Sequence, residues 1–540
     1  MKKLFIALTG MFICAGIFAS EEKIELPQVT TEVSGDKITA GKEAVPDYRK
    51  IIPQYDVKNF PLPDAGVMEE QKIPSEEEKI LAGRKSVYVD GKIGAGYRLD
   101  FLADMSIKAP SENSPFSLNF YHDGGDGFTG GKGEDGFFES FTKVHAVKEF
   151  SSENSRNKIS GLFETENNGF QMMSKTFTEK KSHYAQGNWQ YDRFFSNGTF
   201  LKIYGDGDYY SRSGVKNGSA ASINLWEETA SLLDFNPAVT FGWKTGKMIF
   251  SLKGDYKGSL NLTDSFSSKA SHRGEIFLAY DLLESGYSLH ADVAATVGNA
   301  LGENPVIVPF NLGFSFDRIA GKTGQIVSGY IYGGCKSENN TVSKIEKIYP
   351  FTACTFLPGE TSDWYVKTGA SYGFNNATFG AECEFLTTAY KNGVYRPVYT
   401  DDFFCNSGYY SAVQENRREF NTNVSASFST DLVRMNFLWN AFWLDVPVLE
   451  EKFSIQGNVE FGRKNSKWLC ALSIKQNLAK NADFVPEISG GGEIKMNSSF
   501  RLSLSAKDAV KLFSNTGRKI SSSKYVKKSG GIYLLLKFTL

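Results

Sequence analysis

Residues 532–540 read Ile-Tyr-Leu-Leu-Leu-Lys-Phe-Thr-Leu, and large apolar side chains occupy every even position of this run. The residues at these positions are Ile532, Leu534, Leu536, Phe538 and Leu540. Side chains two residues apart lie on the same face of a β-strand. The run therefore predicts a strand with one continuous apolar face, a pattern typical of a closing strand in a membrane barrel.

The same two-residue alternation extends upstream to Ser86. In residues 87–101 the odd positions are mostly apolar or small, and the even positions are mostly polar. Comparable runs occur at 287–297, 310–317, 364–374, 379–385, 455–461 and 468–474, with turn residues between neighbouring runs. We therefore predict a transmembrane antiparallel up-and-down β-barrel over residues 87–540. At roughly 20 to 28 residues per strand and connection, it would have about 16–22 strands, an even number.

Soluble β-sandwiches, β-propellers and β-helices also alternate, so they are the competing folds. The sequence has no repeat of fixed period, which argues against propellers and solenoids. No linker is apparent after residue 86, although a sandwich of this length would normally divide into domains. No other segment approaches 18 consecutive apolar residues, so membrane-spanning helices are not expected.

The N-terminus has the pattern of an export signal. Lys2 and Lys3 precede an apolar run that ends at Phe18, and the small residues Ala19 and Ser20 follow it. This pattern predicts a signal peptide over residues 1–20. Residues 21–86 hold six of the sixteen prolines and many charges, which predicts an extended periplasmic segment without its own core.

Composition and motifs give little support for a cofactor or a catalytic centre. The formal net charge of -1 provides no electrostatic case for nucleic acid. The five histidines and the scattered cysteines show no metal-ligand spacing, so no metal is expected. Residues 125–130 fit G-x-G-x-x-G but lack a βαβ context, and we interpret the stretch from Asp123 to Gly136 as a surface loop. No cofactor and no enzymatic activity are predicted.

Charged residues at the polar positions of these strands are candidates for the barrel lumen. Lys92, Arg98 and Asp100 share the even face of the first run, and His290 and Asp292 share a face of the run at 287–297. They could tune solute selectivity. Pairing among the charges of the first run is the alternative that we favour. For His290 we favour a polar wall residue over a hydrolytic site, since no nucleophilic serine can be singled out.

Upstream of the last strand, residues 506–513 read Ala-Lys-Asp-Ala-Val-Lys-Leu-Phe. This run resembles the end of TonB-dependent receptor barrels, where the segment commonly contains K-N-L-F, although Lys511 replaces the asparagine. Ser529-Gly530-Gly531 then leads into the last strand, and residues 26–33 resemble a TonB box. The resemblance implies an outer-membrane transport barrel that contacts TonB through residues 26–33. Those receptors carry a globular plug between box and barrel, and residues 21–86 are too few for one.

These observations favour passage or uptake of small solutes, through a porin-like barrel or a plugless barrel of the receptor type. The alternative is a surface adhesin or structural barrel that binds partners through its loops. Both place the barrel in the outer membrane, in contact with lipid and with the barrel assembly machinery, with the N-terminal segment in the periplasm. Whether the lumen is open or occluded is left undecided by the sequence.

The composition of residues 21–86 generates a prediction for the isolated segment. Expressed alone, it should show no cooperative thermal transition by circular dichroism, because it has too few apolar residues to offset the entropy of ordering the chain. A cooperative melt of this fragment would contradict the prediction.

Overall fold

The computed structural model describes residues 87–540 except 98–99, 112, 128–134, 218–224, 264–265, 267, 321–324, 375, 398–405, 448–449, 464–465, 479–484, 515–516 and 520–522. The expected signal peptide, the segment 21–86 and Arg98 therefore lie outside the described residues.

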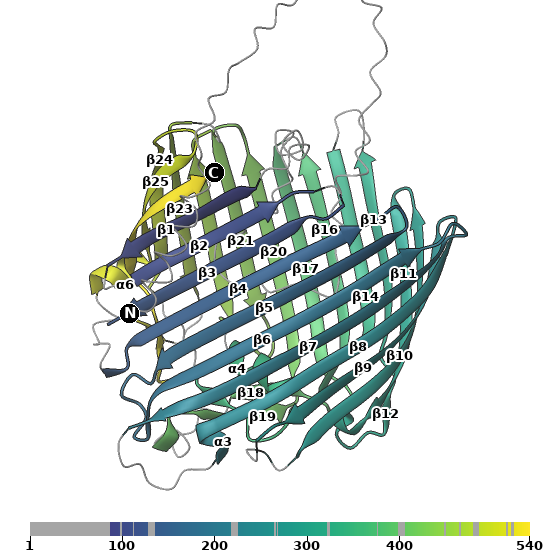
Figure 1. Cartoon of the computed structure of the whole chain (residues 1–540). Coiled ribbons are helices and arrows are strands. Elements are labelled where there is room, and N and C mark those ends of the chain that lie inside the picture. The colour runs from purple at the N-terminus through teal and green to yellow at the C-terminus, as the bar shows by residue number, and fades with distance from the viewer. Residues whose placement is uncertain are drawn as a thin grey trace, which may run out of the picture. The chain divides into compact units, whose positions relative to one another are not determined.

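The described chain folds into one closed sheet of 22 antiparallel strands (Figure 1). Closure is made by the first and last strands, since Ile93 pairs with Leu536 and Gly96 pairs with Tyr533. The strands are β1 (Tyr88–Gly96), β2 (Asp100–Ala109), β3 (Phe116–Asp126), β4 (Phe138–Ser151), β5 (Ser155–Gly169), β6 (Phe177–Phe194), β7 (Thr199–Lys216), β8 (Thr229–Thr245), β9 (Met248–Asn261), β10 (Ala270–Glu284), β11 (Tyr287–Gly298), β13 (Phe310–Ala320), β14 (Gln325–Asn339), β16 (Glu360–Phe374), β17 (Ala377–Thr388), β20 (Arg418–Ser429), β21 (Val433–Phe442), β22 (Phe453–Phe461), β23 (Trp468–Asn477), β24 (Glu487–Lys495), β25 (Phe500–Lys507) and β28 (Gly531–Thr539). The predicted fold class and the upper end of the predicted strand range are confirmed.

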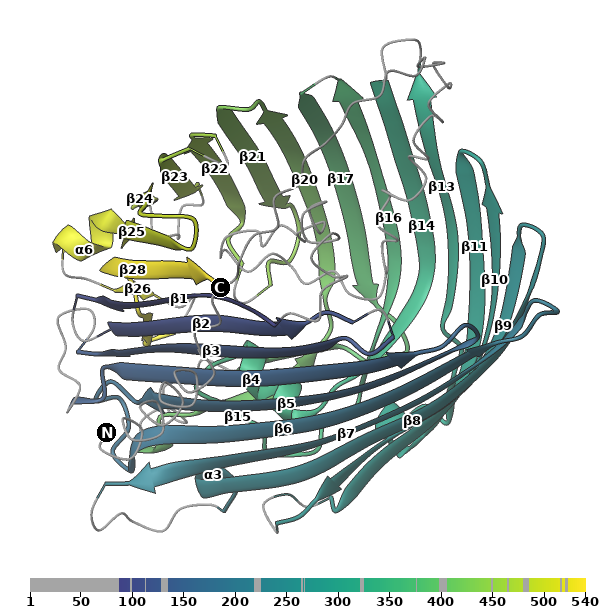
Figure 2. The same ribbon diagram turned by 45° about the horizontal axis from the view of Figure 1, so that its top comes forward.

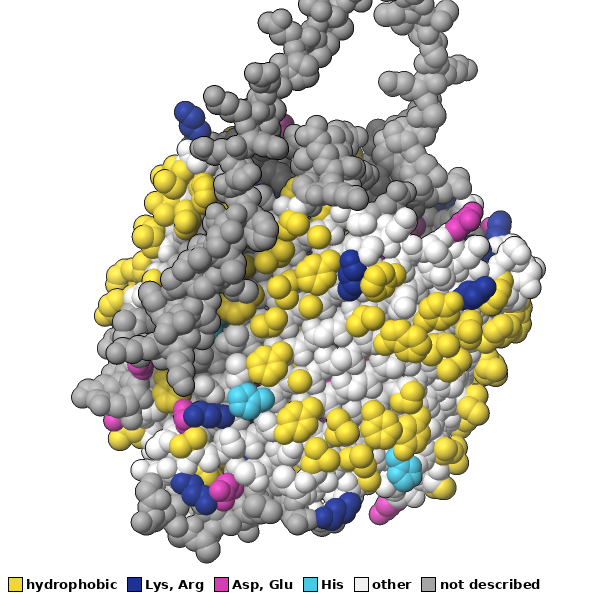
Figure 3. Space-filling model, viewed as in Figure 1, with side chains coloured by type: hydrophobic (Ala, Val, Ile, Leu, Met, Phe, Trp, Pro, Cys, Tyr) yellow, Lys and Arg dark blue, Asp and Glu magenta, His cyan; other side chains and the backbone are white. Residues whose placement is uncertain are grey.

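Alternation in the sequence becomes the difference between the two faces of the wall. On β11, Leu289 and Val293 are 40% and 44% exposed on the outer face, whereas His290 and Asp292 lie on the inner face. Figure 3 shows hydrophobic side chains spread over the strands of the visible outer face, where charged side chains are sparse. An exposed apolar surface of this extent is expected in contact with lipid rather than water.

The last strand follows the same rule. Ile532, Leu534 and Leu540 are exposed on the outer face. The intervening Tyr533 points inward, where its hydroxyl donates a hydrogen bond of 2.8 Å to Asp100 Oδ2. Glycine is required at position 96 of the neighbouring strand, because a Cβ there would lie 2.7 Å from the Tyr533 ring.

Two details differ from the sequence interpretation. The run at 87–101 is divided between β1 and β2 by a turn after Gly96, and the alternation continues across it, so the period alone could not reveal the break. The predicted loop from Asp123 begins later, because β3 extends to Asp126. Gly125 permits this continuation, since a Cβ there would lie 2.0 Å from Asp100 Oδ1.

The two rims of the barrel differ in the length of their connections. β1 begins and β28 ends at the rim with short turns, such as Gly246 and Lys247 between β8 and β9. The long connections lie at the opposite rim. They contain α3 (Leu225–Glu228), η4 (Asn299–Leu301), β12 (Val306–Ile307), α4 (Val342–Ile348), β15 (Thr352–Ala353), β18 (Val394–Pro397), β19 (Tyr410–Glu415), α6 (Ala509–Ser514), β26 (Arg518–Lys519) and β27 (Val526–Lys527).

Exposed tryptophans lie near both rims. Trp243 and Trp468 are close to short turns, and Trp364 and Trp443 are close to long connections. Indole rings favour the two interfaces of a membrane, so this arrangement fits the aromatic girdles of outer-membrane barrels. In the part of the chain that the structure describes, no helix is both long and apolar enough to span a membrane.

Because the outer face contacts lipid and the inner face is polar, arginine should be costly at one position of β23 and tolerated at the next. Leu472→Arg would place a charge on the lipid face near the middle of the strand and should cost about 2–4 kcal/mol. The matched change Ser473→Arg points into the polar lumen and should be tolerated. The folded fraction can be measured as the species that migrates faster on SDS gels before boiling. Equal losses for both variants would show that the faces are assigned wrongly.

Candidate functional site

The first group of predicted lumen residues forms ion pairs and hydrogen bonds on the inner wall. Lys92 Nζ lies 3.1 Å from Asp104 Oδ2 on the neighbouring strand. Asp100 is 6% exposed and lies 3.3 Å from Lys528 Nζ, in the connection before β28. The structure thus brings Asp100 together with a residue more than 400 positions away in sequence.

His290 and Asp292 form the second predicted pair. The two ring nitrogens of His290 each lie 2.6 Å from a carboxylate, Nδ1 from Asp281 and Nε2 from Asp292. Asn311 Nδ2 donates to Asp292 across 3.4 Å, and the Tyr365 hydroxyl donates to Asn311. Because both ring nitrogens are occupied, the imidazole is not placed to take a proton from a serine. His290 is instead held in a network of side-chain hydrogen bonds on the barrel wall.

Several long connections fold toward the barrel axis and contact one another. We call their described elements α4, β15, β18, β19, β26 and β27 the loop cap. β15 pairs in parallel with β19, which pairs antiparallel with β18, so the connections after β14 and β17 share one small sheet. In Figure 2, where the rim with short turns comes forward, β15 lies behind the front strands β5 and β6.

The core of the loop cap is aromatic. Phe351 and Tyr525 stack at 3.7 Å between ring centroids, and Phe170 meets Tyr409 edge to face at 5.0 Å. The Tyr525 hydroxyl donates to the Gly408 carbonyl across 2.7 Å. These residues come from the connections after β5, β14, β17 and β25, which are widely spaced around the ring. Their contacts therefore bridge the mouth of the barrel from several sides.

A buried ion pair fastens the loop cap to the wall. Arg212 Nε, on β7, lies 2.8 Å from Glu346 Oε2, on α4, and neither side chain is exposed. The same oxygen accepts a 2.7 Å bond from the Tyr210 hydroxyl, and Glu346 Oε1 accepts a 2.9 Å bond from the backbone N–H of Cys354. Such a pair is favourable only when its remaining polar atoms are satisfied, as they are for this carboxylate.

Further charged contacts secure other parts of the connections. Arg417 binds Asp363 with two bonds, Nε to Oδ1 at 3.0 Å and Nη2 to Oδ2 at 2.5 Å. Lys528 lies 2.9 Å from Asp123 Oδ1 as well as near Asp100. Burial alone would lower the pKa of Lys528, but Asp123 and Asp100 raise it above its usual value, so the ammonium stays charged.

A cavity of about 440 Å³ lies where α4 meets the wall. Its lining includes the carboxylates of Asp123, Glu139, Glu164 and Glu166. Lys347 of α4 reaches into this region, with its Nζ 2.7 Å from Glu164 Oε2. Among the residues that the structure describes, no group of three or more His, Cys, Asp or Glu side chains could hold a metal ion.

Comparison with solved structures identifies the fold. The barrel matches the FrpB iron transporter of Neisseria meningitidis (F3-3 variant) with a TM-score of 0.62 and 9% identity, over 86% of this chain and 83% of that one. It matches the ferric enterobactin receptor PfeA of Pseudomonas aeruginosa with a TM-score of 0.58 and 8% identity, over 84% and 80%. The copper transporter OprC gives 0.58 and 9%, over 84% and 80%. This barrel has the TonB-dependent receptor fold.

Sequence comparisons add no closer relative, since no protein-family model and no curated protein match the chain. At 8–9% identity, the receptor fold is what these neighbours share with this chain. The expected resemblance to TonB-dependent receptors is confirmed for the barrel. The TonB-box interpretation of residues 26–33 lies outside the described residues.

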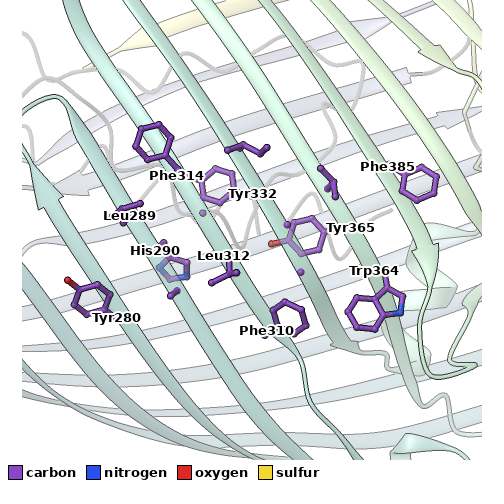
Figure 4. A pocket seen from close by; sticks show the side chains of 16 residues that line it. Tyr280, Leu289, His290, Phe310, Leu312, Phe314, Tyr332, Trp364, Tyr365 and Phe385 are labelled. Carbon is purple, nitrogen blue, oxygen red and sulfur yellow. The ribbon is translucent and has the colours of Figure 1, made fainter.

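The outer wall of this receptor-type barrel carries a second concavity, of about 820 Å³ (Figure 4). Gly333 is paired with Leu312 on one side and with Val366 on the other, so the absence of its side chain leaves a depression between them. Leu312 and Val366 are 58% and 50% exposed on the outer face. The depression is therefore part of the apolar outer surface.

Sequence reasoning missed the residues that hold the loop cap. Arg212 and Glu346 are 134 positions apart, and neither belongs to a motif. Four cysteines are free: Cys335, Cys354, Cys383 and Cys470. Cys14 and Cys405 lie outside the described residues.

The buried pair generates a prediction with an internal control. Glu346→Ala would leave the Arg212 guanidinium buried without its counter-ion and should cost about 3–5 kcal/mol locally. The control is Glu338→Ala, at the end of β14 and just before α4, which removes the ion-pair partner of Lys344. Because the Glu338 side chain is 66% exposed, this change should cost less than about 1 kcal/mol. Limited proteolysis of the loop cap in detergent measures the difference. Equal protection of both variants would contradict the anchoring role of Glu346.

Proposed function

We propose that this chain is an outer-membrane barrel for uptake of small solutes whose mouth is closed by its own loop cap. The observation that carries the proposal is the combination of a polar inner wall with connections that meet across the bore. A wall of 22 strands encloses more space than its side chains can fill, so a path exists once the loop cap moves.

The proposed orientation of the barrel in the membrane follows from the lengths of the connections at its two rims. Outer-membrane barrels place short turns in the periplasm and long loops outside the cell. The loop cap, which belongs to the long connections, would then face the exterior, and residues 21–86 would enter the periplasm before β1. Export through the expected signal peptide of residues 1–20 is consistent with this arrangement.

Coupling to TonB through residues 26–33 is the second part of the proposal. The structural neighbours carry the names of iron, ferric enterobactin and copper transporters or receptors, which supports transport by a barrel of this shape. In this chain the loop cap would occlude the bore from the outside, and energy delivered at the periplasmic end would release it. Lys92, Arg98, Asp100, His290 and Asp292 would then line the path.

A surface-binding barrel is the alternative, and one observation favours it. Phe513 on α6 is 86% exposed and Met172, in the connection after β5, is 73% exposed. Both lie at the rim with long connections, where apolar side chains could contact a partner molecule. A permanently closed barrel with such loops would serve adhesion rather than transport.

Conductance separates these two functions. Full-length protein in planar bilayers should conduct little, and replacement of residues 342–358 by a short Gly-Ser linker should raise conductance, because the bridge across the mouth is removed. Replacement of residues 446–450, in the connection between β21 and β22, is the matched control and should leave conductance low. If neither the full-length protein nor the variant without residues 342–358 conducts, the surface-binding function is favoured.

A further inference from the structure

The inner face of β20–β23 differs in chemistry from the rest of the lumen wall. Three cross-strand rows of its inward positions are fixed by the strand register, and a further row toward the short turns holds the ion pair of Arg434 with Glu460. The rows are Asn423-Asn440-Ser454-Asn477, Ser425-Leu438-Gln456-Lys475 and Ser427-Asn436-Asn458-Ser473. We call these twelve residues the amide patch. All of them are neutral and polar except Leu438 and Lys475, and Lys475 lies opposite Glu487 on β24.

The assignment of this face to the lumen rests on the alternate residues. Val424, Phe437 and Leu472 are 39%, 43% and 43% exposed, and they belong to the apolar outer surface. The amide patch occupies the other face of the same strands. It therefore borders the bore through which a solute would pass.

The polar atoms of the amide patch are poorly satisfied by the protein itself. The side-chain oxygens of Asn440 and Asn477, and of the adjacent Asn421, are shielded from solvent and have no hydrogen-bond partner. Elsewhere the wall pairs some polar groups, as in Lys92 with Asp104 and His290 with its two carboxylates, and it also has unpaired oxygens, for example on the carboxylates of Asp234 and Asp255. In the amide patch the unpaired oxygens belong to neutral amides. An unpaired amide in a polar wall costs free energy, and a ligand able to hydrogen-bond would recover it if the side chain turned toward the bore.

The pattern specifies the kind of ligand. Each Asn or Gln side chain offers both donors and an acceptor, and each Ser hydroxyl can do either. Neighbouring strands lie about 4.7–4.9 Å apart, so each row presents such groups at short regular intervals. A neutral chain of hydroxyl-bearing rings can match this array, with Leu438 beneath an apolar ring face. A charged solute would lose hydration and would find Lys475 as the one charged side chain among the twelve residues of the amide patch.

We propose that the amide patch binds neutral polyhydroxylated solutes, of the oligosaccharide class, on their way through the barrel. This inference rests on the proposed uptake function for its biological meaning, but binding itself can be measured separately. The acidic wall around Glu139, Glu164 and Glu166 faces a different part of the lumen and would repel anionic solutes.

The binding test uses full-length protein in detergent and isothermal titration calorimetry with three trisaccharides of similar size. They are maltotriose, which is neutral, trigalacturonate, which is anionic, and triglucosamine, which is cationic. Maltotriose should bind most tightly. The double variant Asn423→Leu/Asn440→Leu should weaken its binding by about tenfold, or ~1.4 kcal/mol.

The matched control is Asn119→Leu, an asparagine replaced on the inner face of β3, outside the amide patch. It should leave maltotriose affinity unchanged. Equal affinity for all three trisaccharides, no measurable affinity for maltotriose, or an unchanged affinity in the double variant would each overturn the proposal.

Flux measurements keep the two proposals apart. Liposomes containing the variant without residues 342–358 should release maltotriose faster than trigalacturonate. Binding without flux in any variant would overturn uptake and leave the amide patch standing. Flux that does not discriminate between maltotriose and trigalacturonate would support uptake and overturn the amide patch.

Discussion

The structure depends on the pairing of β1 with β28. In a bilayer the backbone N–H and C=O groups of a strand cannot bond to water, so a sheet with free edges is not stable there. Pairing from Asp90 with Thr539 to Gly96 with Tyr533 removes both edges. Once the sheet is closed, every strand has one face toward lipid and one toward the lumen, and the alternation of the sequence acquires its physical meaning.

Closure also explains why the charged and amide side chains lie mainly on the inner wall. The outer face must remain apolar, so charged and amide side chains collect on the inner wall and at the rims. There they either pair with each other, as His290 does with Asp281 and Asp292, or keep an oxygen without a partner, as Asn440 and Asn477 do in the amide patch. The loop cap completes this arrangement, because it covers the mouth with buried aromatic rings and fastens them with ion pairs. Contacts among its own connections distinguish this barrel from one whose loops stay apart.

Periodicity predicted the regular part of the molecule well. The run at 287–297 became β11, and the final alternating run became β28, because a half-buried strand needs only local alternation. The turn after Gly96 was missed because the alternation passes through it unbroken. Of the predicted lumen residues, His290 and Asp292 contact each other on β11, and their place in a transport path stays a prediction. The loop cap could not be predicted, since contacts such as Arg212 with Glu346 join distant, aperiodic segments and leave no local pattern.

The way the loop cap is held has a consequence for how it can open. Its described cysteine, Cys354, is a free thiol, so no covalent bond between these described segments has to be reduced before they move. The strength of the Arg212–Glu346 attraction instead depends on the exclusion of water, because the energy of a charge pair falls steeply as the local dielectric constant rises. The first water molecules to reach Glu346 would weaken the contact that keeps out the next. The loop cap would then open abruptly and cooperatively as water enters around Glu346, and it would close again when the water is excluded.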